Sequence, residues 1–182
     1  MYKVILFDLD GTLTESGEGI TKSVQYALEK LGKPEDDLKK LEVFVGPPLL
    51  QQFMEYAGLD EETGIKAVEY YRERYSTVGI FENQPYPGVE EMLDTLCQKG
   101  YTLAVASSKP EYFVKKILDH FGLTGYFSEI VGSEMSGKRT GKAEVIEEVL
   151  ARLNMQNHRD EVIMVGDKEH DVFGARKAGI EC

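Results

Sequence analysis

The sequence predicts an α/β fold in which helices cover a parallel β-sheet and an all-helical segment is inserted after the first strand. Four short apolar segments end abruptly, and an amphipathic helical pattern precedes each of the last three. A long stretch between the first and second segments contains only helical patterns. The chain has 182 residues, 42% of them hydrophobic, which is enough for one domain that carries a smaller insert.

The four predicted strands cover residues 3–7, 102–106, 129–132 and 161–165. Each segment is apolar almost without interruption, which is typical of strands that are buried on both faces of a sheet. Strands of this kind, separated by helices, favour a parallel sheet with helices on both sides.

Three helices are predicted in the second part of the chain because apolar residues recur there at helical spacing. The first lies between Pro87-Gly88 and Gly100, and the second ends at Gly122. The third begins just after Lys142. The apolar positions of the three helices are Val89, Met92, Leu93 and Leu96; Val114, Ile117, Leu118 and Phe121; and Val145, Ile146, Val149, Leu150 and Leu153.

The stretch from Asp8 to Pro87 contains no predicted strand. Three apolar stripes at helical spacing lie in it instead: Ile20, Val24, Ala27, Leu28 and Leu31; Leu50, Phe53, Met54 and Ala57; and Ile65, Val68 and Tyr75. We therefore expect residues 15–83 to form a helical domain, and residues 1–14 together with 84–182 to form the sheet domain. The alternative, helices that simply pack on the sheet, would require an unusually long crossover connection.

Composition excludes several classes of protein. The 32 acidic and 21 basic residues give a net charge of −11, which argues against general nucleic-acid binding. No apolar run approaches the ~20 residues of a membrane span, and the chain starts in a strand without room for a signal peptide. Cys97 and Cys182 are too few for a disulfide framework. We expect a cytoplasmic protein with reduced thiols.

Polar residues follow three of the predicted strands at their carboxyl ends, where open parallel sheets bind ligands. They are Asp8, Asp10, Gly11 and Thr12; Ser107, Ser108 and Lys109; and Asp167 with Asp171, while Lys142 starts the helix before the last strand. Carboxylates gathered at one edge repel one another unless a cation lies among them, and Mg²⁺ prefers such oxygen ligands. A metal ion, a lysine and the loop N–H groups would together attract a phosphate group. The sequence therefore predicts a phosphate-ester site.

These residues resemble the four motifs of the haloacid dehalogenase-like superfamily in order and in strand context. The matching positions are Asp8-Leu9-Asp10-Gly11-Thr12-Leu13, Ser107, Lys142, and Gly166-Asp167 with Asp171. The sequence is similar to the phosphatase branch, including phosphoglycolate phosphatases and 5'-nucleotidases. This resemblance implies a Rossmann-like core, a helical cap domain, and hydrolysis of a small phosphorylated metabolite, with Mg²⁺ as cofactor.

The resemblance also implies a role for each residue. Asp8 would be the nucleophile that forms an aspartyl-phosphate, and Asp10 would be the general acid and base. Ser107 and Lys142 would complete the catalytic set, and phosphate would contact Gly11, Thr12, Ser107, Ser108 and Lys142. The metal would bind Asp8, Asp167 and the backbone carbonyl of Asp10, with Asp171 placed to hold a metal-bound water. An Asp at the start of a helix is also favoured by the helix dipole, so Asp171 has a second interpretation.

Two alternatives to a phosphatase remain at this point. A phosphomutase of the same superfamily would use the same motifs, and a receiver-like phospho-signalling domain gathers similar side chains at a sheet edge. We expect a monomer or homodimer without nucleic-acid or membrane partners. Family members usually continue beyond the last acidic motif, so we expect the sheet to lack a final strand and helix after Ala178.

Overall fold

The computed structural model describes residues 1–136 and 138–182, and these form two compact units. The first unit contains residues 1–14 and 85–182, and the second contains residues 15–84. The sequence analysis divides the chain after residue 14 and after residue 83. The first division coincides with that of the structure, and the second differs from it by one residue. That the second unit serves as a cap remains a prediction.

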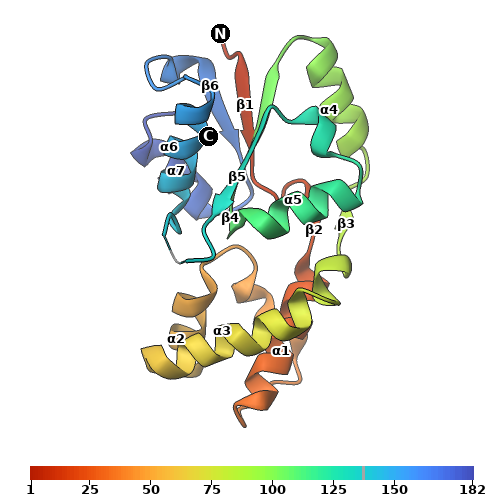
Figure 1. Ribbon diagram of the computed structural model, residues 1–182, viewed down its shortest axis with the longest axis vertical. Coiled ribbons are helices and arrows are strands. Elements are labelled where there is room, and N and C mark those ends of the chain that lie inside the picture. The colour runs from red at the N-terminus through yellow and green to blue at the C-terminus, as the bar shows by residue number, and fades with distance from the viewer. Residues whose placement is uncertain (137) are drawn as a thin grey trace. The chain divides into compact units, whose positions relative to one another are not determined.

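The first unit contains a parallel sheet of four strands: β1 (Val4–Phe7), β4 (Thr102–Pro110), β5 (Glu129–Ser133) and β6 (Val162–Val165). Their order is β5-β4-β1-β6, so β1 lies between β4 and β6 (Figure 1). Val4 of β1 is level with Thr102 of β4 and with Val162 of β6. The predicted α/β fold class is confirmed, and this register brings the carboxyl ends of the three strands together.

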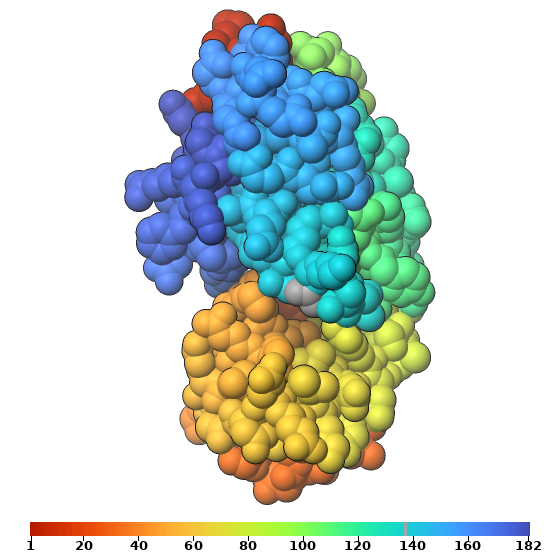
Figure 2. All heavy atoms as spheres, turned by 60° about the vertical axis from the view of Figure 1, so that its left-hand side comes forward, coloured from red at the N-terminus to blue at the C-terminus, as the bar shows by residue number. Residues whose placement is uncertain are grey.

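Helices cover both faces of this sheet. α6 (Lys142–Arg152) and α7 (Glu169–Lys177) lie on one side, and α4 (Val89–Gln98) and α5 (Glu111–His120) lie on the other (Figure 1). Alternate residues of the strands pack against α6, and the residues around α6 form an outer layer of this unit (blue in Figure 2). The core on that side includes Val4, Leu6, Ala104, Val131, Val145, Ile146, Val149, Val162 and Met164. Residues such as these drive folding because their apolar surface leaves water.

The second unit is helical. It consists of α1 (Gly17–Lys30), α2 (Leu49–Ala57) and α3 (Glu61–Tyr75), with 3₁₀ turns η1 (Leu38–Phe44) and η2 (Gly79–Phe81). α1 packs against α3 closely, and its Gly19 meets Gly79 of η2 with no space for a side chain. The largest fully buried side chains of this unit are Leu28, Leu41, Phe44, Phe53, Tyr75 and Ile80.

Two features differ from the sequence prediction. Short strands β2 (Thr14–Glu15) and β3 (Gln84–Pro85) pair with each other, so the prediction of no strand between Asp8 and Pro87 is wrong. Two residues of predicted apolar stripes, Ile65 and Met92, are exposed. Periodicity identified these helices correctly but could not show how wide a face each one buries.

The end of the chain pairs with β6. The Met164 amide donates to the Glu181 carbonyl at 2.9 Å, and Ile163 bridges Glu181 in parallel orientation. Two further 3₁₀ turns, η3 (Thr124–Tyr126) and η4 (Arg159–Glu161), connect elements of this unit. Among the helices of the described residues, none has the length and apolar character that crossing a membrane would require.

Candidate active site

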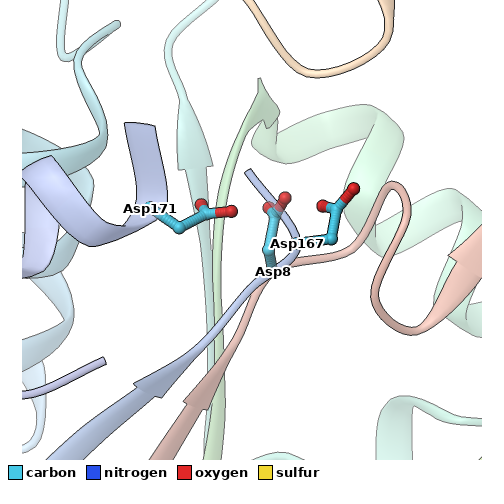
Figure 3. Close-up of side chains that lie close together, drawn as sticks. All are labelled: Asp8, Asp167 and Asp171. Carbon is cyan, nitrogen blue, oxygen red and sulfur yellow. The ribbon is translucent and has the colours of Figure 1, made fainter. Parts of the chain in front are cut away.

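Three predicted carboxylates meet at the carboxyl edge of the sheet. Asp8 directly follows β1, Asp167 follows β6, and Asp171 lies in the first turn of α7. One oxygen of each carboxylate lies within 4.8 Å of the others, and the three side chains converge (Figure 3). β1 and β6 are paired neighbours, and the Asp8 amide continues this pairing by donating to the Val165 carbonyl at 2.9 Å. The meeting of these groups is therefore a consequence of strand order.

Lys142 lies between two of these carboxylates. Its ammonium nitrogen is 2.7 Å from Asp8 Oδ1 and 2.8 Å from Asp171 Oδ1, and it donates to the Ala106 carbonyl at 2.9 Å. The side chain is only 3% exposed, although lysines are almost never buried without partners. Burial by itself would lower the pKa of the Lys142 ammonium, but Asp8 and Asp171 raise that pKa above its ordinary value. The lysine is therefore a fixed positive charge beside Asp8.

The surroundings of Asp8 disfavour the negative charge of its carboxylate. Burial is the largest influence and raises the pKa of the Asp8 carboxyl, while Lys142 opposes this shift and Asp171 and Asp10 reinforce it. One lysine is thus insufficient to offset the loss of water around this carboxylate. A further cation close to Asp8 would favour the ionised form that a nucleophile requires.

Asp171 has two structural contacts. Its Oδ1 faces Lys142, and its Oδ2 accepts a hydrogen bond from the backbone amide of Lys168 at 3.1 Å. The second contact caps the start of α7, as expected for an acidic residue at that position. Both interpretations of Asp171 from the sequence are therefore compatible with its surroundings.

Asp10 is paired with a lysine that the sequence did not assign to any role. Lys109 Nζ lies 2.9 Å from Asp10 Oδ2, and the two side chains are 7% and 8% exposed. The following residue, Gly11, has a φ of +86°, and a Cβ there would overlap the Asp167 carboxylate. Only glycine permits both this backbone conformation and this close approach.

The predicted hydroxyl groups occupy two different settings. Ser107 is buried near the end of β4, and its Oγ accepts a hydrogen bond from the Lys109 amide at 3.3 Å. The carbonyl of the preceding residue, Ala106, contacts Lys142, which ties this strand end to Asp8. Thr12 Oγ1 is buried and has no hydrogen-bond partner among the described residues. Ser108 is half-buried.

The charges of the site indicate which cation would fit. Four carboxylates face two buried ammonium groups: Asp8, Asp10, Asp167 and Asp171, against Lys142 and Lys109. Lys168 is exposed and 3.7 Å from Asp167, so it offsets little of this charge. When all groups are ionised, the surplus equals the charge of one divalent cation. The donors are hard oxygen atoms, which suit Mg²⁺.

Two glycines leave space for side chains of the site, Gly174 for Lys142 and Gly166 for Asp171. A Cβ on Gly174 of α7 would lie 2.6 Å from Cγ and 2.8 Å from Cβ of Lys142. A Cβ on Gly166 would overlap the carboxyl group of Asp171. Sequence reasoning missed Gly174, because its only signal is a glycine inside a predicted helix.

Comparisons with known proteins agree with these observations. The family model described as haloacid dehalogenase-like hydrolase matches residues 5–182. A Pseudomonas aeruginosa protein named 5'-nucleotidase is 47% identical over 181 residues, which is 100% of this chain and 81% of that protein. The phosphoglycolate phosphatase of Aquifex aeolicus is 32% identical over 180 residues, covering 97% of this chain and 81% of that protein.

Two further proteins extend the comparison. A crystal structure described as a predicted phosphatase from Clostridium acetobutylicum has a TM-score of 0.95 and 49% identity, covering 99% of this chain and 82% of that one. The Mycobacterium tuberculosis protein named tyrosine-protein kinase PtkA is 38% identical over 179 residues, which cover 98% of this chain but 60% of that protein. The named activities therefore differ, although each concerns a phosphoryl group.

Proposed function

This chain belongs to the haloacid dehalogenase-like hydrolases, and we propose that it is a Mg²⁺-dependent phosphomonoesterase that acts through an aspartyl-phosphate on Asp8. The chain is an enzyme of the phosphatase type. The observation that carries the finer proposal is the buried contact of 2.7 Å between Lys142 and Asp8. It provides a nucleophile with a fixed positive charge beside it, where a phosphoryl group would bind.

The first step transfers the phosphoryl group to the enzyme. An oxygen of Asp8 forms a bond to phosphorus while the bond from phosphorus to the leaving oxygen breaks. Asp10 gives its proton to that leaving oxygen, so the alcohol departs neutral. Lys142 and the Ser107 hydroxyl stabilise the negative charge on the phosphoryl oxygens.

The second step releases phosphate and restores the enzyme. A water molecule attacks phosphorus as Asp10 takes one of its protons, and the bond between phosphorus and the Asp8 oxygen breaks. Inorganic phosphate leaves, Asp8 is again a carboxylate, and Asp10 again carries the proton for the next cycle. One carboxyl group thus acts as acid and then as base.

We propose that Asp8, Asp167 and the backbone carbonyl of Asp10 hold the metal ion, with Asp171 behind them. The surplus negative charge of the four carboxylates and the raised pKa of Asp8 support this assignment. Bound Mg²⁺ would neutralise the phosphoryl oxygens and keep Asp8 ionised.

The substrate class is a small phosphate monoester such as 2-phosphoglycolate or a nucleoside 5'-monophosphate. The names of the P. aeruginosa and A. aeolicus relatives support this choice. Phosphate release should be measured over a panel of 2-phosphoglycolate, nucleoside monophosphates and sugar phosphates, with and without Mg²⁺. Turnover that survives EDTA would contradict the metal assignment. If the protein hydrolysed none of the esters in the panel, the substrate class would be wrong.

The covalent mechanism is tested with Asp8→Asn and a matched control, Asp94→Asn. Asp94 is an exposed residue of α4 whose carboxylate contacts Gln98. We expect Asp8→Asn to abolish turnover. It should also abolish the acid-stable labelling of the protein by a substrate with a radioactive phosphoryl group, while Asp94→Asn keeps both. An active Asp8→Asn protein would refute the aspartyl-phosphate.

A second candidate function follows from the similarity to the protein named PtkA. The aspartyl-phosphate could pass its phosphoryl group to a hydroxyl group other than water, as in a kinase or a phosphomutase. The two outcomes separate in one measurement, because a phosphatase releases one phosphate for each ester consumed. If less phosphate were released than ester consumed, and the missing phosphoryl groups were found on a second acceptor, the result would favour transfer.

A further inference from the structure

Lys109 is a buried lysine whose ammonium group contacts the acid/base carboxylate rather than the nucleophile. It lies 2.9 Å from Asp10 Oδ2, and neither side chain is more than 8% exposed. Removing two charges from water is costly, and a surface position for either side chain would avoid this cost. A pair buried at the carboxyl edge of the sheet therefore indicates that the position of Asp10 matters.

The backbone of the same residue contacts a second member of the site. The Lys109 amide donates to Ser107 Oγ at 3.3 Å. Because this oxygen accepts a bond from the amide, the hydroxyl proton of Ser107 is directed elsewhere and can be donated. One residue at the end of β4 thus links the phosphate-binding hydroxyl with the carboxylate that exchanges the proton.

The two oxygens of Asp10 have different surroundings. Oδ2 faces the ammonium group of Lys109, whereas Oδ1 is buried without a hydrogen-bond partner among the described residues. A buried carboxylate oxygen without a partner is costly unless a ligand satisfies it. This asymmetry indicates that Oδ1 is the oxygen that meets the substrate.

We propose that Lys109 is a positioning residue that anchors Oδ2 of Asp10 and leaves Oδ1 as the oxygen that gives and takes the proton. This inference rests on the proposed function, in which Asp10 is the acid and base. With the proton on Oδ1, Oδ2 still accepts from the ammonium group, so the anchor persists through both steps. In the first step the Oδ1 proton passes to the leaving oxygen as the ester bond breaks, and in the second step water returns a proton to Oδ1.

A positioning role makes a prediction that a phosphate-binding role does not. Esters with a poor leaving group need the proton from Asp10, whereas a good leaving group departs as a stable anion without it. Loss of the anchor should therefore slow the first step for phenyl phosphate and spare it for 4-nitrophenyl phosphate. A lysine that bound the phosphoryl group would affect both esters equally.

The experiment measures release of the phenol in the first turnover, under stopped flow, for both esters. The variants are Lys109→Met, Asp10→Asn as the reference for a lost acid, and Lys115→Met as the matched control. Lys115 is a half-exposed lysine of α5 paired with Glu111. We expect Lys109→Met to slow phenyl phosphate by about 10²-fold with little change for 4-nitrophenyl phosphate and in KM, and Lys115→Met to match the wild type.

The outcomes separate this inference from the proposed function. If Asp10→Asn shows no dependence on the leaving group, the acid role of Asp10 is wrong and the positioning role fails with it. If Asp10→Asn shows the dependence and Lys109→Met does not, only the role of Lys109 is wrong. An equal loss for both esters, or a raised KM for both, would assign Lys109 to phosphate binding instead.

A double variant covers the case in which Lys109→Met does not fold with a buried, unpaired carboxylate. Asp10→Asn with Lys109→Met removes both charges together. Because Lys109 acts through Asp10, the double variant should release both phenols at the rates of Asp10→Asn alone. A further loss in the double variant would overturn the proposal.

Discussion

Replacing Gly174 with alanine should displace Lys142 and reduce activity by about 10²-fold, the usual cost of moving a reacting group by ~1 Å. The new Cβ would lie 2.6 Å from Cγ and 2.8 Å from Cβ of Lys142, both in the part of the side chain nearest its backbone. These atoms cannot move aside as the flexible end of a side chain would. The contacts of Lys142 with Asp8, Asp171 and the Ala106 carbonyl, all 2.7–2.9 Å, would then lengthen.

The effect on stability should be smaller than the effect on activity. Overpacking of this kind costs about 1–3 kcal/mol, while alanine in place of glycine inside a helix contributes about 1 kcal/mol in the opposite direction. We therefore expect a loss of at most about 2 kcal/mol in the free energy of unfolding, or about 4–8 °C in Tm for a chain of this size.

The assay compares kcat on the best ester of the panel with thermal unfolding of the same protein. Gly125→Ala is the matched control, because no atom lies within 4 Å of a Cβ at that position of the same unit. The control should keep the activity of the wild type. A Gly174→Ala protein with wild-type kcat would refute the reasoning, since Lys142 would then tolerate displacement or would not be needed.

Three further predictions concern other parts of the chain. Asp171→Asn should lower kcat by about 10- to 100-fold, because Lys142 loses a partner at 2.8 Å, and an unchanged kcat would contradict this role. The hydrogen bond from Arg74 holds the pKa of Glu82 below its ordinary value. Glu82 therefore stabilises the fold at pH values above the pKa of an unfolded glutamate. This contribution disappears as the pH falls through the pKa of Glu82 in the folded protein. Glu82→Gln should therefore cost about 1 kcal/mol at neutral pH and nothing in acid, as measured by urea unfolding at several pH values. Leu6→Ala should cost about 2–5 kcal/mol in the same assay, since this side chain of β1 is fully buried, and a smaller loss would indicate that the core collapses around it.

The sheet could be predicted from the sequence because its strands are apolar on both faces. Residues 161–165, for example, form β6 with a difference of one residue at its start. The pairing of Thr14–Glu15 with Gln84–Pro85 could not be predicted, because two polar residues carry no period and their partners are far away in the sequence. Such pairs depend on tertiary contacts rather than on local preference.

The carboxylates of the site could be predicted for a similar reason, because each follows a strand whose position in the sheet is fixed by its neighbours. The role of Lys109 could not. A lysine after a strand is usually a solvated residue, and nothing in the sequence shows that this one is buried against Asp10. Its position two residues after Ser107 was the available signal, and only the fold showed which carboxylate it faces.

The site also explains how a protein with a net charge of −11 can attract a phosphate ester. Long-range electrostatics would repel the ester, but screening by physiological salt limits that repulsion to about 8 Å. At shorter range the ester meets the buried ammonium group of Lys142, held in place by two carboxylates that cannot turn away. The carboxylates that make the chain acidic thus fix the lysine, and a divalent cation among them would offset the local negative charge that the phosphoryl group meets. Under this interpretation, removing the metal should leave the negative charge of the carboxylates uncompensated, so phosphate affinity should fall together with turnover.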